Sequence, residues 1–212
     1  MNVYLETLRK QNDLPELTEM RLFAEKENVP ILEEESMQLL LQILALTNAK
    51  RVLEIGSAIG YSALRLVSGG FERKVTTVER DWKRYDQARF FLAHSSYRQS
   101  ITLLHGDAFD YVEAIAKGPS FDALFIDAAK GYNQSFIETF APYVKTGGVI
   151  VVDNVLFKGW AADPAGAPKR LQKLARNVHA FNEWFQNHPA FVTWFHAVGD
   201  GLAVGIKREN LL

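Results

Sequence analysis

Beyond residue 50, short apolar runs alternate with stretches that have helical periodicity. Each apolar run is rich in Val, Ile, Leu or Phe and is bounded by Gly or by a charged residue. Strands buried on both faces lose the alternation between inward and outward residues, so they take the form of apolar runs. Strict alternation of strand and helix predicts βαβ units, a parallel sheet and right-handed crossovers. The predicted strands are 51–56, 74–79, 100–106, 121–127 and 148–153, and the predicted helices between them are 61–69, 81–96, 107–117 and 132–144.

The two ends of the sequence depart from this alternation. Residues 2–48 have helical periodicity and are interrupted by Pro15 and Pro30. Near the other end, a predicted helix over 169–187 precedes the segments FVTWFHA and GLAVGIKR. Both segments alternate, and VGDG separates them, which is a pattern typical of a β-hairpin.

These elements predict a single domain over residues 1–212. A helical cap over 1–48 is expected to precede an α/β core over 50–212. The expected fold is a Rossmann-like doubly wound sheet, mostly parallel, that closes with an antiparallel C-terminal hairpin. A chain of 212 residues with 48% hydrophobic residues can bury the substantial core that such a sheet needs.

Charge and composition exclude several classes of protein. The net charge of −1 excludes a uniformly basic nucleic-acid binder, although it is compatible with a local basic patch. The absence of Cys excludes disulfides, thiolate zinc sites and a Cys nucleophile. The opening segment is charged throughout, unlike a signal peptide, and no apolar run approaches the roughly 20 residues that span a bilayer. We therefore expect a soluble cytoplasmic protein without membrane contact.

The segment LEIGSAIGYSALRLV predicts a strand, a glycine turn and the start of a helix. Glycine lets the backbone approach a ligand closely, and the helix N–H groups then face that ligand. The spacing of Gly56 and Gly60 differs from the dinucleotide fingerprint, and Ala58 replaces its middle Gly. Because Glu54 would repel a pyrophosphate, this turn suits a ligand with an ammonium or sulfonium group. The alternative is an ordinary tight turn with Ser62 as a helix residue.

Acidic residues end four consecutive strand regions, at Glu54, Glu79, Asp107 and Asp127. The carboxyl ends of an open parallel sheet are where its ligands bind. An acid after the second strand can bind ribose hydroxyls, and Asp107 can accept from an adenine amino group. The alternatives are helix caps and solvated charges at helix starts.

The segment VIVVDNVLFKGW places Asp153 and Asn154 directly after a buried strand. Together with Asp127, at the end of a strand expected nearby, they offer two carboxylates and an amide oxygen. Mg²⁺ prefers such oxygen ligands and keeps waters that substrate oxygens can displace. The alternative is a strand-ending turn, since Asp and Asn are common turn residues.

The motifs LEIGSAIGYSA, VTTVE, GDA, FDALFIDAAKGYN and GGVIVVDNVL together resemble the class I S-adenosylmethionine-dependent, metal-dependent O-methyltransferases of the catechol and caffeoyl-CoA type. The resemblance runs from about residue 30 to the C-terminus. It implies that S-adenosylmethionine and a divalent cation such as Mg²⁺ bind this chain. The implied cofactor-binding residues are Leu32, Glu54, Gly56, Ser62, Glu79, Asp107, Ala108 and Asp127, with Glu54, Gly56 and Ser62 on the methionine part, Glu79 on the ribose and Asp107 with Ala108 on the adenine. The implied metal ligands are Asp127, Asp153 and Asn154, and the implied catalytic residues are Lys130 and Asp127.

Lys130 lies three residues beyond Asp127, where the family has a catalytic Lys. Methyl transfer to oxygen is fastest when the acceptor is an oxyanion, and a metal lowers the pKa of a bound hydroxyl. A desolvated Lys beside a cation can serve as the base. The expected reaction is in-line attack on the sulfonium methyl, promoted mainly by positioning. The alternative for Lys130 is a surface loop residue.

The sequence constrains the methyl acceptor less than it constrains the cofactor. Lys169, Lys173 and Arg176 are spaced to share a helix face, and Arg170 lies beside them. Such a face is often only solvated, but next to a methyl-transfer site it could contact RNA phosphates. Trp160 could instead form one wall of a small pocket for a catechol.

The segments VPILEEES and HAFNEWFQNHPAF resemble the bacterial branch of this family that converts 5-hydroxyuridine in tRNA to 5-methoxyuridine. This resemblance implies binding of a tRNA anticodon loop, whose bases can be splayed into a pocket, and a homodimer. The alternatives are a small-molecule catechol-type O-methyltransferase and a cofactor-binding module without catalysis.

Overall fold

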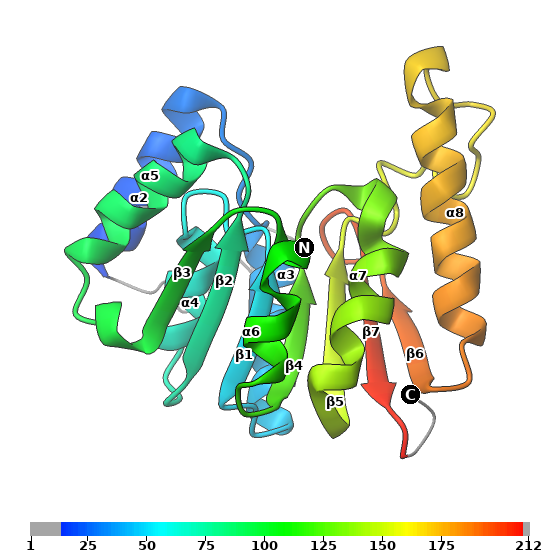
Figure 1. The fold of residues 1–212 in the computed structure, drawn as a ribbon. Coiled ribbons are helices and arrows are strands. Elements are labelled where there is room, and N and C mark those ends of the chain that lie inside the picture. Colours follow the sequence, from blue (N-terminus) through cyan, green and yellow to red (C-terminus); the bar gives the residue numbers. More distant parts are fainter. Residues whose placement is uncertain (1–13, 210–212) are drawn as a thin grey trace.

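Within residues 14–209, which the computed structural model describes, seven strands form one sheet (Figure 1). The strands are β1 (Arg51–Ile55), β2 (Lys74–Glu79), β3 (Ile101–His105), β4 (Phe121–Ile126), β5 (Val144–Asp153), β6 (Phe191–His196) and β7 (Leu202–Lys207). Their spatial order is β3-β2-β1-β4-β5-β7-β6. Strands β1 to β5 pair in parallel, and β7 pairs antiparallel with β5 and β6. This arrangement confirms the predicted Rossmann-like sheet with an antiparallel C-terminal hairpin.

Strand β5 begins at Val144, earlier than the predicted start at residue 148. Its register on β4 shifts, because Phe121 pairs with Val144 but Ala123 pairs with Val149. The additional residues of β5 include Gly147, at φ 74°. The sequence pattern detected only the part of β5 that is buried on both faces.

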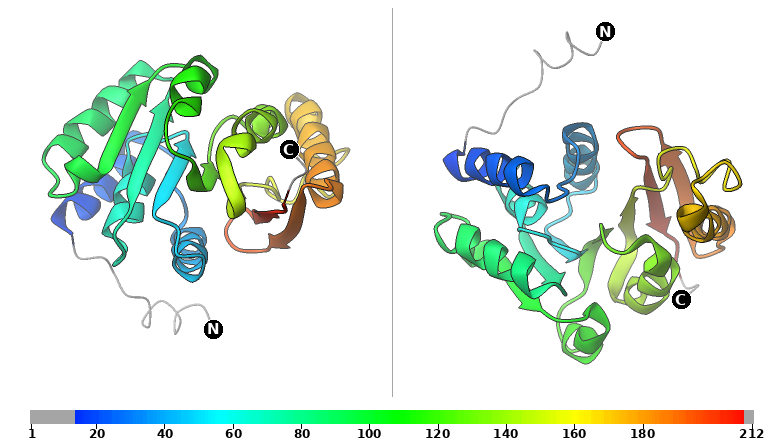
Figure 2. Two further views of the ribbon diagram at one scale, coloured as in Figure 1. Left: turned by 60° about the horizontal axis from the view of Figure 1, so that its bottom comes forward. Right: turned by 90° about the horizontal axis from the view of Figure 1, so that it is seen from above.

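Helices cover both faces of the sheet, as Figure 2 shows from above. Side chains of adjacent strand residues point to opposite faces, so Val52 belongs to one core and Leu53 to the other. The first core contains side chains from α2 (Pro15–Glu27), α3 (Glu34–Leu46), α4 (Tyr61–Ser68) and α5 (Trp82–Ala93). The second contains side chains from α6 (Val112–Ala116), α7 (Asn133–Phe140) and α8 (Gln172–Asn187).

The described part of the predicted helical cap consists of α2 and α3. Pro15 occupies the first turn of α2, where its missing N–H costs no hydrogen bond. Pro30 lies in the connection between the two helices. The rest of the predicted cap, residues 1–13, lies outside the described residues.

Two predicted helices are broken into shorter pieces. The helix predicted over 107–117 is a 3₁₀ turn, η2 (Ala108–Tyr111), followed by α6, and Asp107 caps this turn by accepting from the N–H of Phe109 (3.1 Å). The helix predicted over 132–144 is η3 (Lys130–Tyr132), α7 and η4 (Ala141–Tyr143). The remaining 3₁₀ turns are η1 (Arg98–Ser100) and η5 (Lys169–Leu171). No helix in the described part of the chain is long and apolar enough to cross a membrane.

Candidate active site

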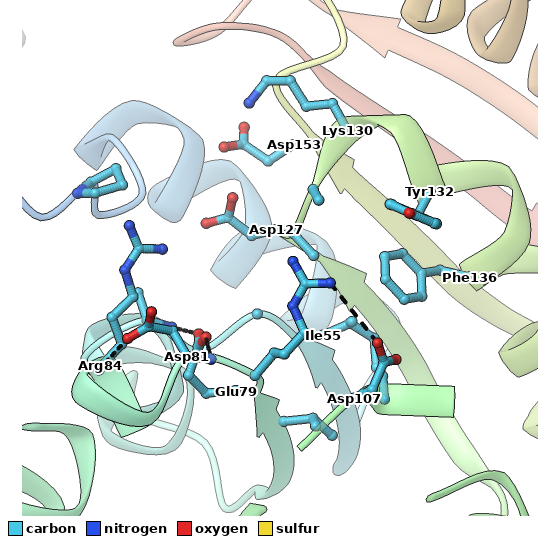
Figure 3. A pocket seen from close by; sticks show the side chains of 18 of the residues that line it. Ile55, Glu79, Asp81, Arg84, Asp107, Asp127, Lys130, Tyr132, Phe136 and Asp153 are labelled. Carbon is cyan, nitrogen blue, oxygen red and sulfur yellow. Dashed lines mark hydrogen bonds and ion pairs between the residues drawn. The ribbon is translucent and has the colours of Figure 1, made fainter. Parts of the chain in front are cut away.

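A cavity of about 790 Å³ opens at the carboxyl ends of the parallel strands (Figure 3). Its wall is built by the segments that follow β1, β2, β3, β4 and β5, the place where open α/β sheets bind ligands. Of the residues singled out in the sequence, it is lined by Gly56, Glu79, Asp107, Ala108, Asp127, Lys130, Asp153 and Asn154. The fold therefore brings these eight residues, which lie up to 98 positions apart in the chain, to one cavity.

Gly56 joins the first strand to the cavity. Its φ of 96° suits glycine, and a Cβ at this position would overlap the backbone carbonyl of Asp127. The N–H of Asp127 in turn donates to the carbonyl of Ile55 (3.0 Å). The turn after β1 and the end of β4 therefore touch, and only glycine allows this approach.

Glu79, at the end of β2, is 7% exposed. One carboxylate oxygen accepts from the N–H of Ala58 (2.8 Å) and the other accepts from the N–H of Asp81 (2.7 Å). Glu79 thus ties the glycine turn to the start of α5 while it lines the cavity. These hydrogen bonds fix the orientation of a carboxylate that faces the ligand space.

Glu54 and Ser62 do not line the cavity. Glu54 is fully buried within β1 and accepts a hydrogen bond from the hydroxyl of Thr77 (2.5 Å). Burial raises the pKa of Glu54 to about 7, although hydrogen bonds from Ser62 and Thr77 oppose the rise. Both predicted residues are therefore buried away from the cavity wall and are in contact with each other.

Leu32 does not line the cavity either. It is 5% exposed and packs in the first core. The preceding residues, Pro30 and Ile31, line the cavity instead. The segment before α3 therefore reaches the ligand space, but with neighbours of the predicted residue.

Asp127, Asp153 and Asn154 meet at one end of the cavity. Burial raises the pKa of Asp127, and the charge of Lys130 opposes this rise. Burial also raises the pKa of Asp153, and the nearby negative charge of Asp127 adds to it. A buried carboxylate at Asp153 and a partly buried one at Asp127, which repel each other, make a favourable site for a cation.

The donor set fits a hard divalent cation. Oδ1 of Asp153 is buried without a hydrogen-bond partner, and Asn154 adds an amide oxygen. Among residues 14–209 no group of three or more His, Cys, Asp or Glu side chains is arranged to hold a metal. The set is therefore complete only when the amide oxygen of Asn154 is counted, as Mg²⁺ or Ca²⁺ sites allow.

Lys130 reaches the same end of the cavity from η3. Its Nζ donates to Oδ1 of Asn154 (2.6 Å) and lies 6.0 Å from the centre of the Phe157 ring. Figure 3 shows its side chain extending towards Asp153. The amine of Lys130 and the carboxylates of Asp127 and Asp153 therefore line the same cavity, in which an amine can act as a general base towards a bound hydroxyl.

Sequence reasoning missed several cavity residues in the segment after Glu79. Arg80 forms an ion pair with Asp107 (3.9 Å), and Asp81 caps α5 by accepting from the N–H of Arg84 (2.9 Å). Tyr132 and Phe136 form part of the opposite wall (Figure 3). The lining residues that were missed are Pro30, Ile31, Ile55, Ala58, Val78, Arg80, Asp81, Trp82, Arg84, Gly106, Phe109, Ala128, Ala129, Tyr132 and Phe136. The run RDWKR, directly after a strand that ends in an acid, was the signal for part of this set.

The four basic residues considered for RNA binding lie outside the cavity wall. Lys173 and Arg176 belong to α8, whereas Lys169 and Arg170 belong to η5. The expected single helix face therefore does not extend to Lys169, because the α-helix begins at Gln172. All four side chains are exposed, and in the part of the chain that the structure describes none forms an ion pair.

Comparison with known proteins identifies the family of the chain. An O-methyltransferase family model matches residues 5–208. A catechol O-methyltransferase from Mycobacterium tuberculosis is 33% identical over 172 residues, which cover 76% of this chain and 73% of that protein. A Staphylococcus aureus protein, provisionally described as a caffeoyl-CoA O-methyltransferase, has a crystal structure that superposes with a TM-score of 0.89 at 32% identity, over 96% of this chain and 97% of that one. The cofactor-bound structure of Rv0187 from M. tuberculosis superposes with a TM-score of 0.83 at 27% identity, over 99% of this chain and 96% of that one. The chain therefore belongs to the O-methyltransferase family.

Proposed function

We propose that this O-methyltransferase transfers the methyl group of S-adenosylmethionine to a hydroxyl oxygen that is held beside a divalent cation. One observation carries the proposal: Glu79 and Asp107 line one part of the cavity, while Asp127, Asp153, Asn154 and Lys130 line another. A cofactor and an acceptor can therefore be bound side by side, as group transfer requires.

The first part of the cavity suits the cofactor. Glu79 is fixed by two backbone N–H groups and can accept from both hydroxyls of a ribose. Asp107 can accept from the adenine amino group, next to the small side chain of Ala108. Gly56 leaves room for the methionine part, and the acidic wall attracts the positive sulfonium. The cofactor-bound Rv0187 structure, at 27% identity, supports this use of the fold.

The second part of the cavity suits the cation and the acceptor. Asp127, Asp153 and Asn154 would hold Mg²⁺, which when bound would lower the pKa of the acceptor hydroxyl and fix its position. Lys130 would accept the hydroxyl proton at Nζ. The acceptor oxygen would then bond to the methyl carbon as the bond from that carbon to sulfur breaks, which would leave S-adenosylhomocysteine.

For the acceptor we propose 5-hydroxyuridine at the wobble position of tRNA, converted to 5-methoxyuridine. The uridine presents adjacent O4 and 5-hydroxyl oxygens, which can chelate a cation as a catechol does. The exposed cations at Lys169, Arg170, Lys173 and Arg176 offer phosphate contacts. The resemblance of the chain to the bacterial tRNA-modifying branch supports the same choice, and with it a cytoplasmic homodimer.

A small-molecule catechol is the second candidate. It is favoured by the M. tuberculosis catechol O-methyltransferase, at 33% identity over 76% of this chain. The ring of Trp160 lies 5.3 Å from that of Phe157, which offers an apolar surface near Lys130. A cofactor-binding module without catalysis is disfavoured, because binding S-adenosylmethionine alone needs neither Lys130 nor Asn154.

The test is a direct acceptor assay. The protein is incubated with labelled S-adenosylmethionine, Mg²⁺ and either tRNA that carries 5-hydroxyuridine or a panel of catechols. Label in tRNA, recovered as 5-methoxyuridine, is the expected result. Label in catechols alone would replace the tRNA proposal with the second candidate, and full activity in EDTA would overturn the metal proposal.

A further inference from the structure

The tip of the β6–β7 hairpin holds the loop that follows the proposed metal ligands. The N–H of Val155 donates to the carbonyl of Gly201 (3.1 Å), and the N–H of Leu156 donates to the carbonyl of Asp200 (2.9 Å). These bonds continue the antiparallel pairing of β5 and β7 beyond the ends of the strands. Asn154 lies between the last ladder pair and these two bonds, so its backbone is fixed on both sides.

A third contact comes from a side chain. The carboxylate of Asp200 accepts a hydrogen bond from the N–H of Lys158 (2.5 Å), 42 residues away in the chain. Phe157 and Lys158 have φ values of 49° and 57°, in the left-handed region that residues other than glycine rarely adopt. A backbone held there needs external contacts to persist, and Asp200 supplies one at the second of these two residues.

The held loop touches the proposed base. The Phe157 ring lies 6.0 Å from Nζ of Lys130, and the same Nζ donates to Asn154 (2.6 Å). The conformation of residues 154–158 therefore determines both the position of the amide ligand and the surroundings of the amine. A change in this loop would move two groups of the proposed reaction together.

We propose that Asp200 is a positioning residue for the methyl-transfer site: its carboxylate, through the N–H of Lys158, keeps the loop after β5 in the conformation that presents Asn154 and Phe157 to the cation and to Lys130. The proposal rests on the proposed function, because it takes Asn154 as a ligand of the cation. In this proposal Asp200 positions the loop through its hydrogen bond with the N–H of Lys158 and not through its charge. A neutral hydrogen-bond acceptor at residue 200 should therefore position the loop equally well.

The first test is amide hydrogen exchange of the loop in metal-free protein. In Asp200→Ala, the amide of Lys158 loses its acceptor, and we expect exchange at residues 155–161 to become at least about 10-fold faster. In Asp200→Asn, the amide oxygen accepts the same bond, and exchange stays within about 3-fold of the wild type. Asp163→Ala is the matched control, because Asp163 lies in the same loop but accepts from Gly166 (3.1 Å), away from the ligands.

The second test is binding of Mn²⁺, followed by calorimetry. Loss of a group that orients a metal ligand typically costs 10-fold to 100-fold in affinity, so we expect the Kd of Asp200→Ala to rise by about 10-fold or more. Asp163→Ala should keep the wild-type Kd, and Asp200→Asn, which loses only the negative charge near Asp153, should bind Mn²⁺ more tightly than Asp200→Ala does. Gly201→Ala disturbs the same loop independently, because a Cβ at residue 201 would overlap the side chain of Leu156. This variant should weaken Mn²⁺ binding although the Asp200 carboxylate is intact.

Two results would overturn the role of Asp200: an Asp200→Ala protein with unchanged exchange and unchanged Mn²⁺ affinity, or an Asp200→Asn protein as impaired as Asp200→Ala. The second result would assign the effect to the negative charge. If wild-type protein binds neither Mn²⁺ nor Mg²⁺, the cation site of the proposed function is wrong. The exchange experiment then still decides whether Asp200 holds the loop.

Discussion

Nζ of Lys130 donates a 2.6 Å hydrogen bond to Oδ1 of Asn154. The proposed base and the proposed amide ligand of the cation are therefore direct partners. A cation bound to Asn154 would lie close to the amine and would repel its protonated form. The metal and the proton of Lys130 are thus coupled, and this relationship leads to the first prediction.

Replacing Lys130 separates catalysis from metal binding. We expect Lys130→Met to lower the rate of methyl transfer by roughly 10²-fold to 10⁴-fold, the usual contribution of a general base. Mn²⁺ should bind this variant at least as tightly as the wild type, because a nearby positive charge is removed. Lys130→Arg is the matched control: it keeps the charge, but it cannot give up a proton at neutral pH. An active Lys130→Arg protein would show that the charge, and not proton transfer, is the contribution of Lys130.

Metal binding should weaken as the pH falls. In the metal-free protein, burial raises the pKa of Asp127 to about 6 and that of Asp153 to about 7. Protons therefore compete with the cation below about pH 7, and the affinity for Mn²⁺ should increase with pH and then level off. Calorimetric titrations between pH 5.5 and 8 measure this dependence, with Asp153→Asn as the control that binds weakly throughout. An affinity that is constant over this range would contradict the proposed ligands.

Glu54 should make the metal-free protein less stable as the pH rises. Its pKa is raised from 4.5 to about 7 in the folded state, so its stabilising contribution is present below the unfolded value and is lost as the pH rises through about 7. The loss is roughly 3 kcal/mol at about 1.4 kcal/mol per pKa unit. Asp127 and Asp153 act with the same sign, so the difference between wild type and Glu54→Gln isolates this residue.

Urea unfolding of both proteins in EDTA, from pH 4.5 to 8, measures that difference. Glu113→Gln is the control, because its side chain is 90% exposed and its charge is solvated. Stability curves of wild type and Glu54→Gln that run parallel would contradict the raised pKa.

The ion pair of Arg65 with Glu34 attaches the helical cap to the core. Arg65 is 3% exposed and donates to both carboxylate oxygens of Glu34 (2.6 and 2.9 Å). Removing either partner leaves the other charge without its ion pair, which should lower the free energy of unfolding by about 3 kcal/mol. The double variant Glu34→Gln with Arg65→Met should cost less than the sum of the single variants.

The matched control for this pair is the exposed ion pair of Arg89 with Asp86 (2.7 Å), whose side chains are 65% and 44% exposed. Asp86→Ala should cost less than about 1 kcal/mol. Equal losses at the buried and the exposed pair would show that burial of Arg65 does not determine the effect.

The basic residues of η5 and α8 should contribute to tRNA affinity through phosphates. Replacing Lys169, Arg170, Lys173 and Arg176 with Ala should raise the Kd for tRNA and reduce the slope of log K against log salt by up to about 0.7 for each phosphate that the variant no longer neutralises. Replacing Lys26, in α2, and Lys117, directly after α6, is the control. An unchanged salt slope in the fourfold variant would assign these residues to a solvated surface.

Local patterns were sufficient for the sheet and for the acidic residues that line the cavity at the strand ends. Glu79, Asp107, Asp127 and Asp153 follow apolar runs, and the carboxyl ends of parallel strands lie on the same edge of a sheet. Their approach to one cavity therefore needed no knowledge of the exact packing. The bounds of β5 and of the broken helices were less accurate, because bulges and 3₁₀ turns leave little trace in periodicity.

Side-chain direction and long-range partners were determined only by the tertiary structure. Glu54 has the same local pattern as the other acids, but it lies inside β1, which is paired on both sides, so it faces the core and not the cavity. Asp200 lies in a hairpin tip that predicts a turn and nothing more, until antiparallel pairing brings it to Lys158. The sequence by itself determined where strands and their acidic ends occur, because burial and turn formation are recorded in neighbouring residues. Only the tertiary structure decided which face of the sheet each acidic side chain points to and which distant N–H group it accepts from. Those contacts depend on packing between elements that lie far apart in the sequence.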